Sequence, residues 1–204
     1  MRIRKGKVKD LENLGWAWTP GTPTWHYFSR GIDRGRQEFW VVETSRGALI
    51  GEVHIFWCSV DDDEADGRNR AYLCAFRVHP DHRRQGIGTR LMRRALKRIR
   101  EKGFGEATIG VERDASDLKA LYFRWGFTTL VKVTNIDHHH PDHNGNPMPT
   151  SIPTELYMKR IGPTTGRPVY SLAQDSGEKG KPGNLSVNSQ GPYSHATALV
   201  FSPG

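Results

Sequence analysis

Cysteine and long apolar runs are both scarce in this chain of 204 residues. The two cysteines, Cys58 and Cys74, are too few for a disulfide framework or a structural zinc site. The absence of an apolar run of 18 residues excludes an ordinary membrane-spanning helix. The first residues, Met1–Lys5, also lack the apolar block of a signal peptide. We therefore expect a cytoplasmic protein that makes no membrane contact.

Hydrophobic residues are also few, at 36% of the chain, which predicts that one part builds no core. That part is residues 162–204, where Gly, Pro and Ser supply 18 of 43 positions and no helical or strand period is sustained. Residues 1–161 are predicted to form one domain, and 162–204 a flexible tail.

The net charge of +8 is concentrated in one segment. Residues 83–102 hold nine Lys or Arg and one acid, so the rest of the chain is balanced. No aromatic residues alternate with these bases and no recognition motif accompanies them, which argues against a nucleic-acid partner. A basic helix of this kind favours a small ligand that carries several phosphates.

Alternating apolar residues predict strands, and apolar residues at helical spacing predict helices. Residues 107–111 follow a helical crossover, so this strand should lie parallel to strand 71–78. The predicted elements in chain order are strand 2–5, helix 8–15, a helix through 25–32 capped by Thr24, strands 38–44 and 48–58, strand 71–78, a helix starting near Ile87, strand 107–111, helix 115–125 capped by Asp114, and strands 127–136 and 153–161.

The stretch after strand 71–78 is the most informative in the chain. Pro80 stops the strand, Gly86 and Gly88 follow, and an amphipathic helix begins at Ile87. Glycines allow the backbone to approach a ligand closely, and the first N–H groups of a helix have no acceptor within it. This arrangement is typical of a phosphate-binding turn.

The pattern Arg83-x-x-Gly86-x-Gly88 resembles the pyrophosphate-binding motif of the GNAT superfamily of N-acetyltransferases. Val78-His79-Pro80 before the motif and Trp125-Gly126-Phe127 after it continue the resemblance. It implies an α/β (mixed α+β) fold with a central, mostly antiparallel sheet of about seven strands, splayed at two parallel strands and flanked by helices. The alternative is another nucleotide-binding α/β domain, but neither a G-x-G-x-x-G turn nor a Gly-Lys-Ser/Thr loop is present.

The resemblance implies that acetyl-CoA (coenzyme A) is the cofactor and assigns residues to it. Tyr122 falls on the position that donates a proton to the leaving thiolate. The backbone of one strand segment would hold the pantetheine arm, and the amides of the following turn would surround the diphosphate. These residues are Phe76, Arg77 and Val78 for the arm, and Arg83, Arg84, Gln85, Gly86, Ile87, Gly88 and Thr89 for the diphosphate.

Two positions depart from the family pattern. Cys74 stands where members often have the Glu that serves as base, and Ala115 stands where they often have Asn. A buried thiol is a poor nucleophile because burial raises its pKa, so an acetyl-cysteine step is not expected. Glu52, on the neighbouring predicted strand, is the first candidate for the base.

The acceptor is expected at one edge of the sheet. The acid-rich loop 59–70 lies where strand 71–78 starts, and strand 128–136, taken as an antiparallel neighbour of 107–111, would bring the His-rich loop 137–147 to the same edge. An acidic rim favours cationic acceptors. No metal site is predicted, because consecutive histidines in a loop lack a fixed geometry. The candidate substrate contacts are Trp18, His26, Cys74, Asp61, Asp63 and His140; for the aromatic ones, a place in the core is the competing interpretation.

These features together predict an N-acetyltransferase that moves an acetyl group from acetyl-CoA to a primary amine of a small molecule or peptide by direct attack in a ternary complex. Aminoglycosides or polyamines are the more specific acceptor classes considered. The alternative is a non-catalytic acyl-CoA-binding module, favoured by the missing Glu at Cys74. The protein is expected to be a monomer or homodimer.

Overall fold

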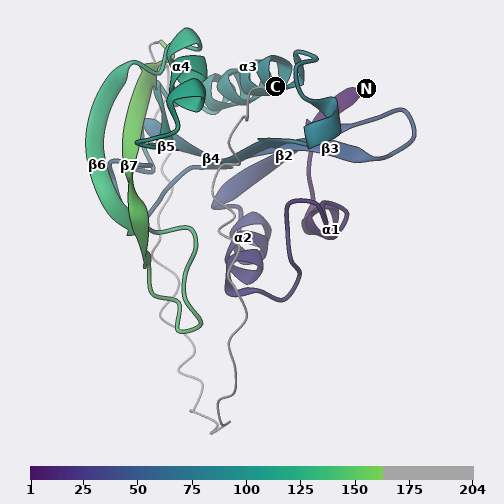
Figure 1. Ribbon diagram of the computed structural model, residues 1–204, viewed down its shortest axis with the longest axis horizontal. Coiled ribbons are helices and arrows are strands. Elements are labelled where there is room, and N and C mark those ends of the chain that lie inside the picture. Colours follow the sequence, from purple (N-terminus) through teal and green to yellow (C-terminus); the bar gives the residue numbers. More distant parts are fainter. Residues whose placement is uncertain (163–204) are drawn as a thin grey trace, which may run out of the picture.

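The computed structural model describes residues 1–162, which form one seven-stranded sheet with helices on both faces (Figure 1). The predicted strands are all present, most with bounds shifted by one to five residues. In chain order the elements are β1 (Arg2–Lys5), α1 (Val8–Glu12), α2 (Pro23–Asp33), β2 (Gln37–Glu43), β3 (Leu49–Phe56), β4 (Arg70–Val78), the short 3₁₀ helix η1 (Pro80–His82), α3 (Ile87–Glu101), β5 (Glu106–Glu112), α4 (Ser116–Arg124), β6 (Thr129–Asp137) and β7 (Met148–Arg160).

The sheet order is β1-β2-β3-β4-β5-β7-β6, and β4–β5 is its one parallel pair. This confirms the predicted mixed, mostly antiparallel sheet. The expectation that β6 lies beside β5 was wrong, because β7 pairs with both of them and separates them. β6 therefore runs in the same direction as β5. Sequence periodicity does not determine which of two successive strands takes the inner position.

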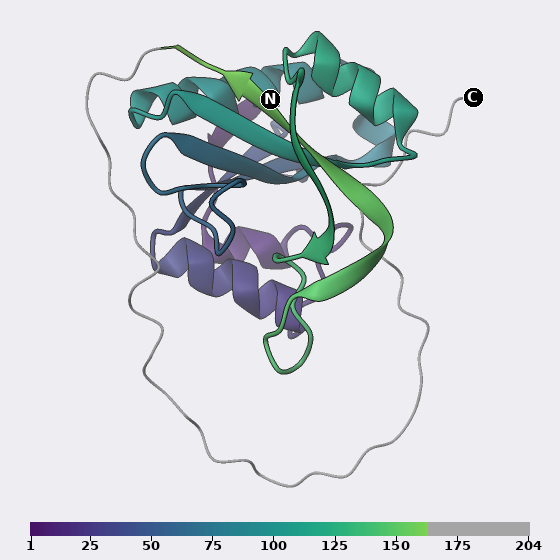
Figure 2. The same cartoon turned by 90° about the vertical axis from the view of Figure 1, so that its left-hand side faces the viewer.

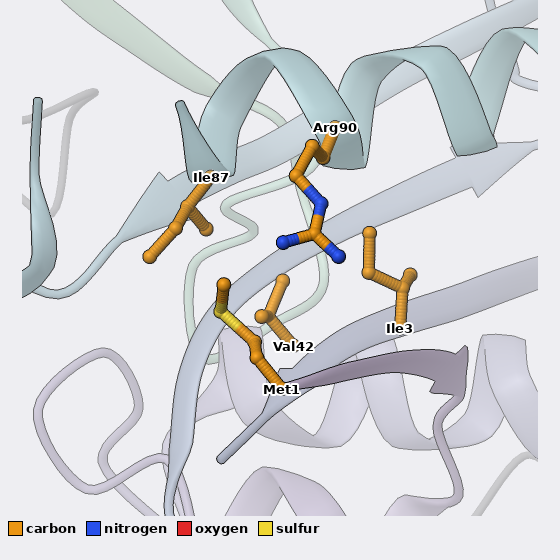
Figure 3. Close-up of a pocket in the computed structure, with 5 residues that line it drawn as sticks. All are labelled: Met1, Ile3, Val42, Ile87 and Arg90. Atoms are coloured by element: carbon orange, nitrogen blue, oxygen red, sulfur yellow. The ribbon is translucent and has the colours of Figure 1, made fainter. Parts of the chain in front are cut away.

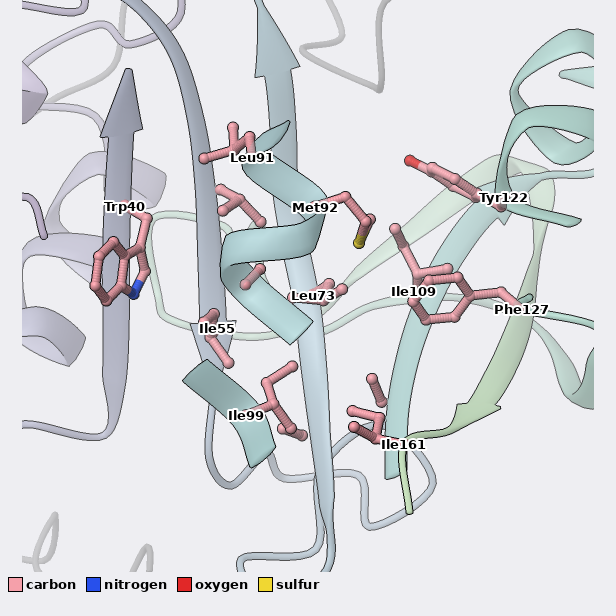
Figure 4. Close-up of a cluster of buried hydrophobic side chains, with 14 of the residues drawn as sticks. Trp40, Ile55, Leu73, Leu91, Met92, Ile99, Ile109, Tyr122, Phe127 and Ile161 are labelled. Carbon is pink, nitrogen blue, oxygen red and sulfur yellow. The ribbon is translucent and has the colours of Figure 1, made fainter. Parts of the chain in front are cut away.

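Successive side chains along the strands pack into two separate cores, one on each face of the sheet. On one face, α3 and α4 cover a cluster that includes Leu73, Leu91, Ile99, Ile109 and Phe127, all at most 2% exposed (Figure 4). On the other face, α1 and α2 cover a second cluster built around the buried rings and aliphatic chains of Leu11, Leu14, Trp18, Phe28, Phe39, Val41 and Phe56. The two helical layers lie above and below the sheet in Figures 1 and 2.

Two helix caps differ from the predictions. α2 begins two residues earlier than expected: the Thr22 hydroxyl accepts a hydrogen bond from the Trp25 N–H, and Pro23 occupies the first helical position. Thr24 is therefore not the cap. The cap residue of α4 is Ala115 rather than Asp114, and it makes no side-chain capping bond.

The β6–β7 hairpin curls past the sheet edge toward α2, and its loop lies beside that helix (Figures 1 and 2). Lys132 on β6 forms an ion pair with Asp61, and His139 in the hairpin loop contacts Glu64 with 2.9 Å between Nε2 and Oε2. The acid-rich and His-rich loops thus meet, as expected. They are brought together by the curl of the hairpin. The strand order expected from the sequence is not the cause.

The predicted tail mostly lies outside the described residues, which end at Gly162. In the described part of the chain, no helix combines the length and apolar character needed to cross a membrane.

The buried ion pair between Glu38 and Arg98 ties β2 to α3. The guanidinium donates two hydrogen bonds of 2.8 and 2.7 Å to the carboxylate, whose side chain is 5% exposed. Burial by itself would raise the pKa of Glu38, but Arg98 outweighs this and lowers it. Glu101 also faces Arg98, at 3.7 Å, and is 38% exposed.

We predict that Glu38→Gln lowers the free energy of unfolding by about 1.5–3 kcal/mol, because it removes a charge-assisted pair at a buried site. The matched Glu101→Gln variant should lose less than about 1 kcal/mol, since exposed pairs contribute little. Because the pKa of Glu38 is depressed in the folded state, its contribution should be present near neutrality and disappear as pH falls through the acidic range. Urea unfolding at several pH values measures both effects, and equal losses in the two variants would contradict the assignment.

Candidate active site

The parallel strands β4 and β5 pair over only the first part of their length. Their register ends where Leu73 lies opposite Ile109, whereas β4 continues to Val78 and β5 to Glu112. Beyond that point β4 stays paired with β3, and β5 with β7. Within the described chain, β4 from Cys74 onward therefore has no strand on its β5 side. Its backbone is available there to pair with an extended ligand.

A β-bulge at Ala75 changes which face of the sheet the β4 side chains occupy. Cys74 lies opposite His54 of β3, but Arg77 lies opposite Glu52, so β4 accommodates one extra residue. Ala75 takes φ +46°, a left-handed conformation that costs a residue other than glycine about 1–3 kcal/mol. As a result, Cys74 and Arg77 both point to the face covered by α1 and α2.

The turn between β4 and α3 holds the second residue of this strained type. Apart from glycines, Arg84 (φ +56°) and Ala75 are the described residues with positive φ. Gly86 (φ +73°) then caps α3, and the first helical hydrogen bond runs from the Arg90 N–H to its carbonyl. The three N–H groups that precede Arg90 in α3 thus have no helical acceptor. A Cβ placed on Gly86 would meet no atom within 4 Å, so the space beside Gly86 at the start of α3 is open.

Arg83 ties this turn to the end of β4. Its Nε donates a hydrogen bond of 3.2 Å to the Val78 carbonyl, and its backbone N–H donates to the Pro80 carbonyl. The amide of Arg83 is therefore used inside the turn. The N–H groups without a helical acceptor lie after it, at the start of α3.

An aromatic cluster lies under the start of α3 on the α3/α4 face. The Phe76 ring is 5.4 Å from the Trp125 ring and would touch a Cβ on Gly88 at 3.5 Å. Tyr122, 2% exposed, lies 6.0 Å from Trp125, with its hydroxyl turned away from Phe127 (Figure 4). Burial, and to a lesser degree the Cys74 thiol, raises the pKa of Tyr122. The phenol therefore keeps its proton at neutral pH and can donate it.

Glu52 is enclosed on the opposite face and is held by three partners. Its Oε1 lies 2.8 Å from Arg77 Nε, its Oε2 accepts a 2.8 Å hydrogen bond from Trp18 Nε1, and His54 Nε2 is 3.4 Å away. Its side chain is 0% exposed. Burial would raise the pKa of Glu52, but Arg77, His54 and Trp18 together outweigh this effect, so the pKa is lowered. Glu52 is thus a stable carboxylate and a weak proton acceptor.

A second group of buried polar side chains lies on this face nearer the hairpin loop. Glu64 and His139 form a contact of 2.9 Å, the Tyr72 ring stacks on His139 at 4.9 Å, and the Tyr27 hydroxyl is 3.4 Å from His139 Nδ1. The sequence analysis did not select these four residues. Each is an aromatic or ionisable residue in a loop, on α2 or on β4. Many residues of the core share this property, so it does not single them out.

A shallow depression beside α3 is separate from this arrangement (Figure 3). Its lining is mostly apolar: Met1, Ile3, Val42, Ile87 and Arg90. It lies against β1 and β2, on the side of α3 away from the gap between β4 and β5. Its lining offers one cationic side chain and does not suit a diphosphate.

A family model described as the acetyltransferase (GNAT) family matches residues 8–127. This span covers more than half of the chain and includes β4, the strained turn and α4. The chain belongs to the GNAT acetyltransferase family. The GNAT assignment made from the sequence motif is thus confirmed. No curated protein matches the chain closely enough to count as a relative.

Solved structures similar to this GNAT protein share its fold at low sequence identity. The ribosomal-protein-S18-alanine N-acetyltransferase of Escherichia coli has 18% identity and a TM-score of 0.56, with 83% of this chain and 99% of that chain covered. The ribosomal-protein-alanine N-acetyltransferase of Brucella melitensis has 18% identity and a TM-score of 0.57, with 78% and 99% covered. Chaetomium thermophilum Naa20, in complex with a bisubstrate analogue, has 21% identity and a TM-score of 0.55, with 78% and 86% covered.

The residues proposed for the acceptor lie in different environments in this GNAT fold. Trp18 is buried against Phe28 and bound to Glu52, so it is part of the core on this face. His26 is exposed on α2. Cys74 lies beside the gap, and burial raises the pKa of its thiol.

The proposed loop contacts are mostly engaged within the chain. Asp61 pairs with Lys132, Asp63 lies 3.7 Å from both Lys132 and Arg70, and His140 contacts Asp137 at 2.6 Å. The acid run is therefore largely neutralised by its own neighbours, which weakens the case for an acidic rim. Within the described residues, no three His, Cys, Asp or Glu side chains form a group that could hold a metal ion.

We predict that Glu52→Gln lowers the free energy of unfolding by about 3–5 kcal/mol, because it leaves the Arg77 charge without its buried partner. The exposed Glu12→Gln variant on α1 is the matched control and should change stability by less than about 0.5 kcal/mol. Adding Arg77→Met to Glu52→Gln should recover part of the loss, since it removes the orphaned charge. Denaturant unfolding of the four proteins checks this, and a loss below 1 kcal/mol for Glu52→Gln would contradict it.

Proposed function

We propose that this GNAT protein acetylates a primary amine, with acetyl-CoA as donor and with direct attack of the amine in a ternary complex. The proposal rests on one feature of the fold: β4 leaves β5 after Leu73, and its unpaired edge leads straight into the turn that opens α3. An extended arm can pair along that edge, and an anionic group can occupy the helix start. A cytoplasmic location and a monomeric or homodimeric state stay predictions from the sequence.

The residues of the gap and the turn fit coenzyme A. The open space in front of Gly86 leaves room for a diphosphate at the N–H groups of Ile87, Gly88 and Thr89. Arg84 and Gln85 are exposed at the same turn, where they can meet phosphate oxygens. The backbone of Phe76, Arg77 and Val78 provides the edge for the pantetheine arm.

Acetyl-CoA, when bound, supplies an acetyl group activated as a thioester. The backbone at the β4 bulge holds the acetyl carbonyl and polarises it by hydrogen bonding. Tyr122 donates its proton to the sulfur that departs. The gap keeps the amine and the carbonyl side by side, which removes much of the entropic cost of their meeting.

The amine must lose a proton as the amide bond forms, so a proton acceptor is needed on the α1/α2 face. Glu52 was the first candidate from the sequence. We infer instead that Glu52 positions Arg77 and the bulge, because its Oε1 is ion-paired with Arg77, its Oε2 accepts a hydrogen bond from Trp18, and its pKa is lowered.

The acceptor amine is proposed by class only. Two of the structural neighbours carry names that specify the alanine of a ribosomal protein, and a peptide α-amine is accordingly one acceptor to test. Aminoglycosides and polyamines are the others. A panel with an alanine-initiated peptide, kanamycin and spermidine, read by release of the coenzyme A thiol, distinguishes these classes. If acetyl-CoA binds but no amine of a broad panel is acetylated, the non-catalytic acyl-CoA-binding module becomes the better reading.

We predict that Gly86→Asp abolishes stabilisation by acetyl-CoA, because it places a negative side chain in the open space before α3. In the parent, the melting temperature should rise with the concentration of acetyl-CoA, because a ligand that binds only the folded state stabilises it. Gly47→Asp is the matched control, since Gly47 also has positive φ (+82°) and open space, but lies in the β2–β3 turn. Thermal shift titration tests this. Equal shifts for Gly86→Asp and Gly47→Asp would show that the diphosphate binds elsewhere.

We predict that Tyr122→Phe lowers kcat by about 10²-fold, the lower end for general acid help, because a thiolate can leave without a proton. The ring packing against Trp125 and Phe127 is retained, so the melting temperature and the acetyl-CoA shift should match the parent. Single-turnover kinetics separate this step from product release. A parental single-turnover rate would assign Tyr122 to packing alone.

A further inference from the structure

Four polar side chains form a continuous line on the α1/α2 face. The Ser59 hydroxyl donates to Glu64 Oε2 at 2.7 Å, and the same oxygen lies 2.9 Å from His139 Nε2. The other ring nitrogen of His139 lies 3.4 Å from the Tyr27 hydroxyl. The line joins three segments that are far apart in sequence: the β3–β4 loop, the β6–β7 loop and α2.

Aromatic rings enclose the His139 imidazole. Its centroid is 4.9 Å from that of Tyr72, in a stacked arrangement, and 4.5 Å from that of Phe56. His139 is 2% exposed and Glu64 is 6% exposed. Each ring nitrogen of His139 thus faces a partner. Because His139 and Glu64 are both buried, solvent screens the attraction between the imidazolium and the carboxylate only weakly. With its proton on Nε2, facing Glu64, the ring presents Nδ1 as an acceptor to Tyr27.

Tyr72 places this line next to the gap between β4 and β5. Its hydroxyl would lie 3.1 Å from a Cβ on Gly110, the first residue of β5 beyond the paired segment. Cys74, two residues along β4, is close enough to contribute to the raised pKa of both Tyr27 and Tyr122, after burial as the main cause. The imidazole is therefore one aromatic ring away from the place where the strands separate.

We propose that Tyr27 contacts the acceptor amine and that His139, oriented by Glu64, takes up the amine's proton through the Tyr27 hydroxyl. This inference rests on the proposed function and adds its proton acceptor. As the amine nitrogen forms its bond to the acetyl carbon, its N–H proton passes to the Tyr27 oxygen, and the Tyr27 proton passes to His139 Nδ1. Tyr122 supplies a proton to the departing thiolate. The imidazolium later releases its proton to solvent and Tyr122 regains one, so the protons balance.

The charges around His139 set the pH range in which it can act. Burial alone would lower the pKa of His139, but the neighbouring carboxylates, Glu64 first, raise it above its ordinary 6.5. An imidazole with a raised pKa accepts a proton only above that pKa, so the rate should fall on the acid side of it. The groups that face the ring are Glu64 and Asp61 from the β3–β4 loop, Asp137 from its own hairpin, Tyr27 from α2 and Tyr72 from β4.

The test measures thiol release against pH with the best amine from the panel, in the full-length protein. His139→Asn and Tyr27→Phe should each lower kcat by about 10²-fold or more and remove the acid limb of the profile. The double variant should be no slower than either single one, because both act in one relay. Glu64→Gln should shift the acid limb to lower pH, since it removes the carboxylate that raises the pKa of His139. His143→Asn, an exposed histidine of the same loop, is the matched control and should leave the profile unchanged.

The outcomes separate this inference from the proposed function. A parent that turns over, with His139→Asn and Tyr27→Phe at parental kcat and an unmoved acid limb, would overturn the relay alone. A parent that binds acetyl-CoA but acetylates no amine would overturn the proposed function and the relay with it. If His139→Asn does not fold, Tyr27→Phe decides, because it keeps the ring between Phe28 and Phe56 and deletes only the hydroxyl. Acetyl-CoA thermal shifts equal to the parent confirm that each variant retains its donor site.

Discussion

The bulge at Ala75 is the constraint on which the site depends. A regular β4 would keep its side-chain alternation and its hydrogen bonding to β5, and there would be no gap. The extra residue shifts the alternation by one, so that Arg77 faces Glu52 on the α1/α2 face while Phe76 packs under α3. The strain of about 1–3 kcal/mol at such a residue is opposed by the ion pair and by the ring packing on either side of it. The same strand thereby has an unpaired edge, where the donor is proposed to bind, and a polar face, where the acceptor is proposed to bind.

The two faces of the sheet are specialised in different ways. The α3/α4 face is almost wholly apolar, and its packing fixes the start of α3 relative to β4. The α1/α2 face buries Glu52, His54, Glu64 and His139 among aromatic rings, and such groups are costly to bury unless they are paired. Each carboxylate there has a cationic or donor partner: Arg77 and Trp18 for one, His139 and Ser59 for the other. One pair lies at the bulge, and the other lies nearer the β6–β7 loop.

Much of the fold follows from local sequence, because strand alternation, the Pro80 stop and the glycine turn are all short-range signals. Those signals identified β4 and α3, and the donor site is proposed from them. They did not identify the position of β7, since the order of two successive strands depends on long-range pairing. They brought the acid-rich and His-rich loops to one edge but did not single out Glu64 or His139, which meet because the β6–β7 hairpin curls over the sheet edge. Glu52 was selected for its position on β3, but its partner Arg77 depends on the bulge, which no sequence pattern announces.

The hairpin links the stability of this face to its proposed chemistry, with opposite pH demands. Asp61 pairs with Lys132 and Glu64 with His139, which holds the hairpin against the β3–β4 loop, and Asp137 contacts His140 within the hairpin loop. The pKa values of these carboxylates are lowered, so their contribution to stability is lost as pH falls. The pKa of His139 is raised, so its attraction to Glu64 is full between the pKa values of the two groups and is lost as pH rises through that of His139. The loop is thus held most firmly while the imidazole is charged, whereas a proton acceptor must be neutral. Tyr72 and Phe56, which pack on the ring in either state, keep it in place when the charge is gone.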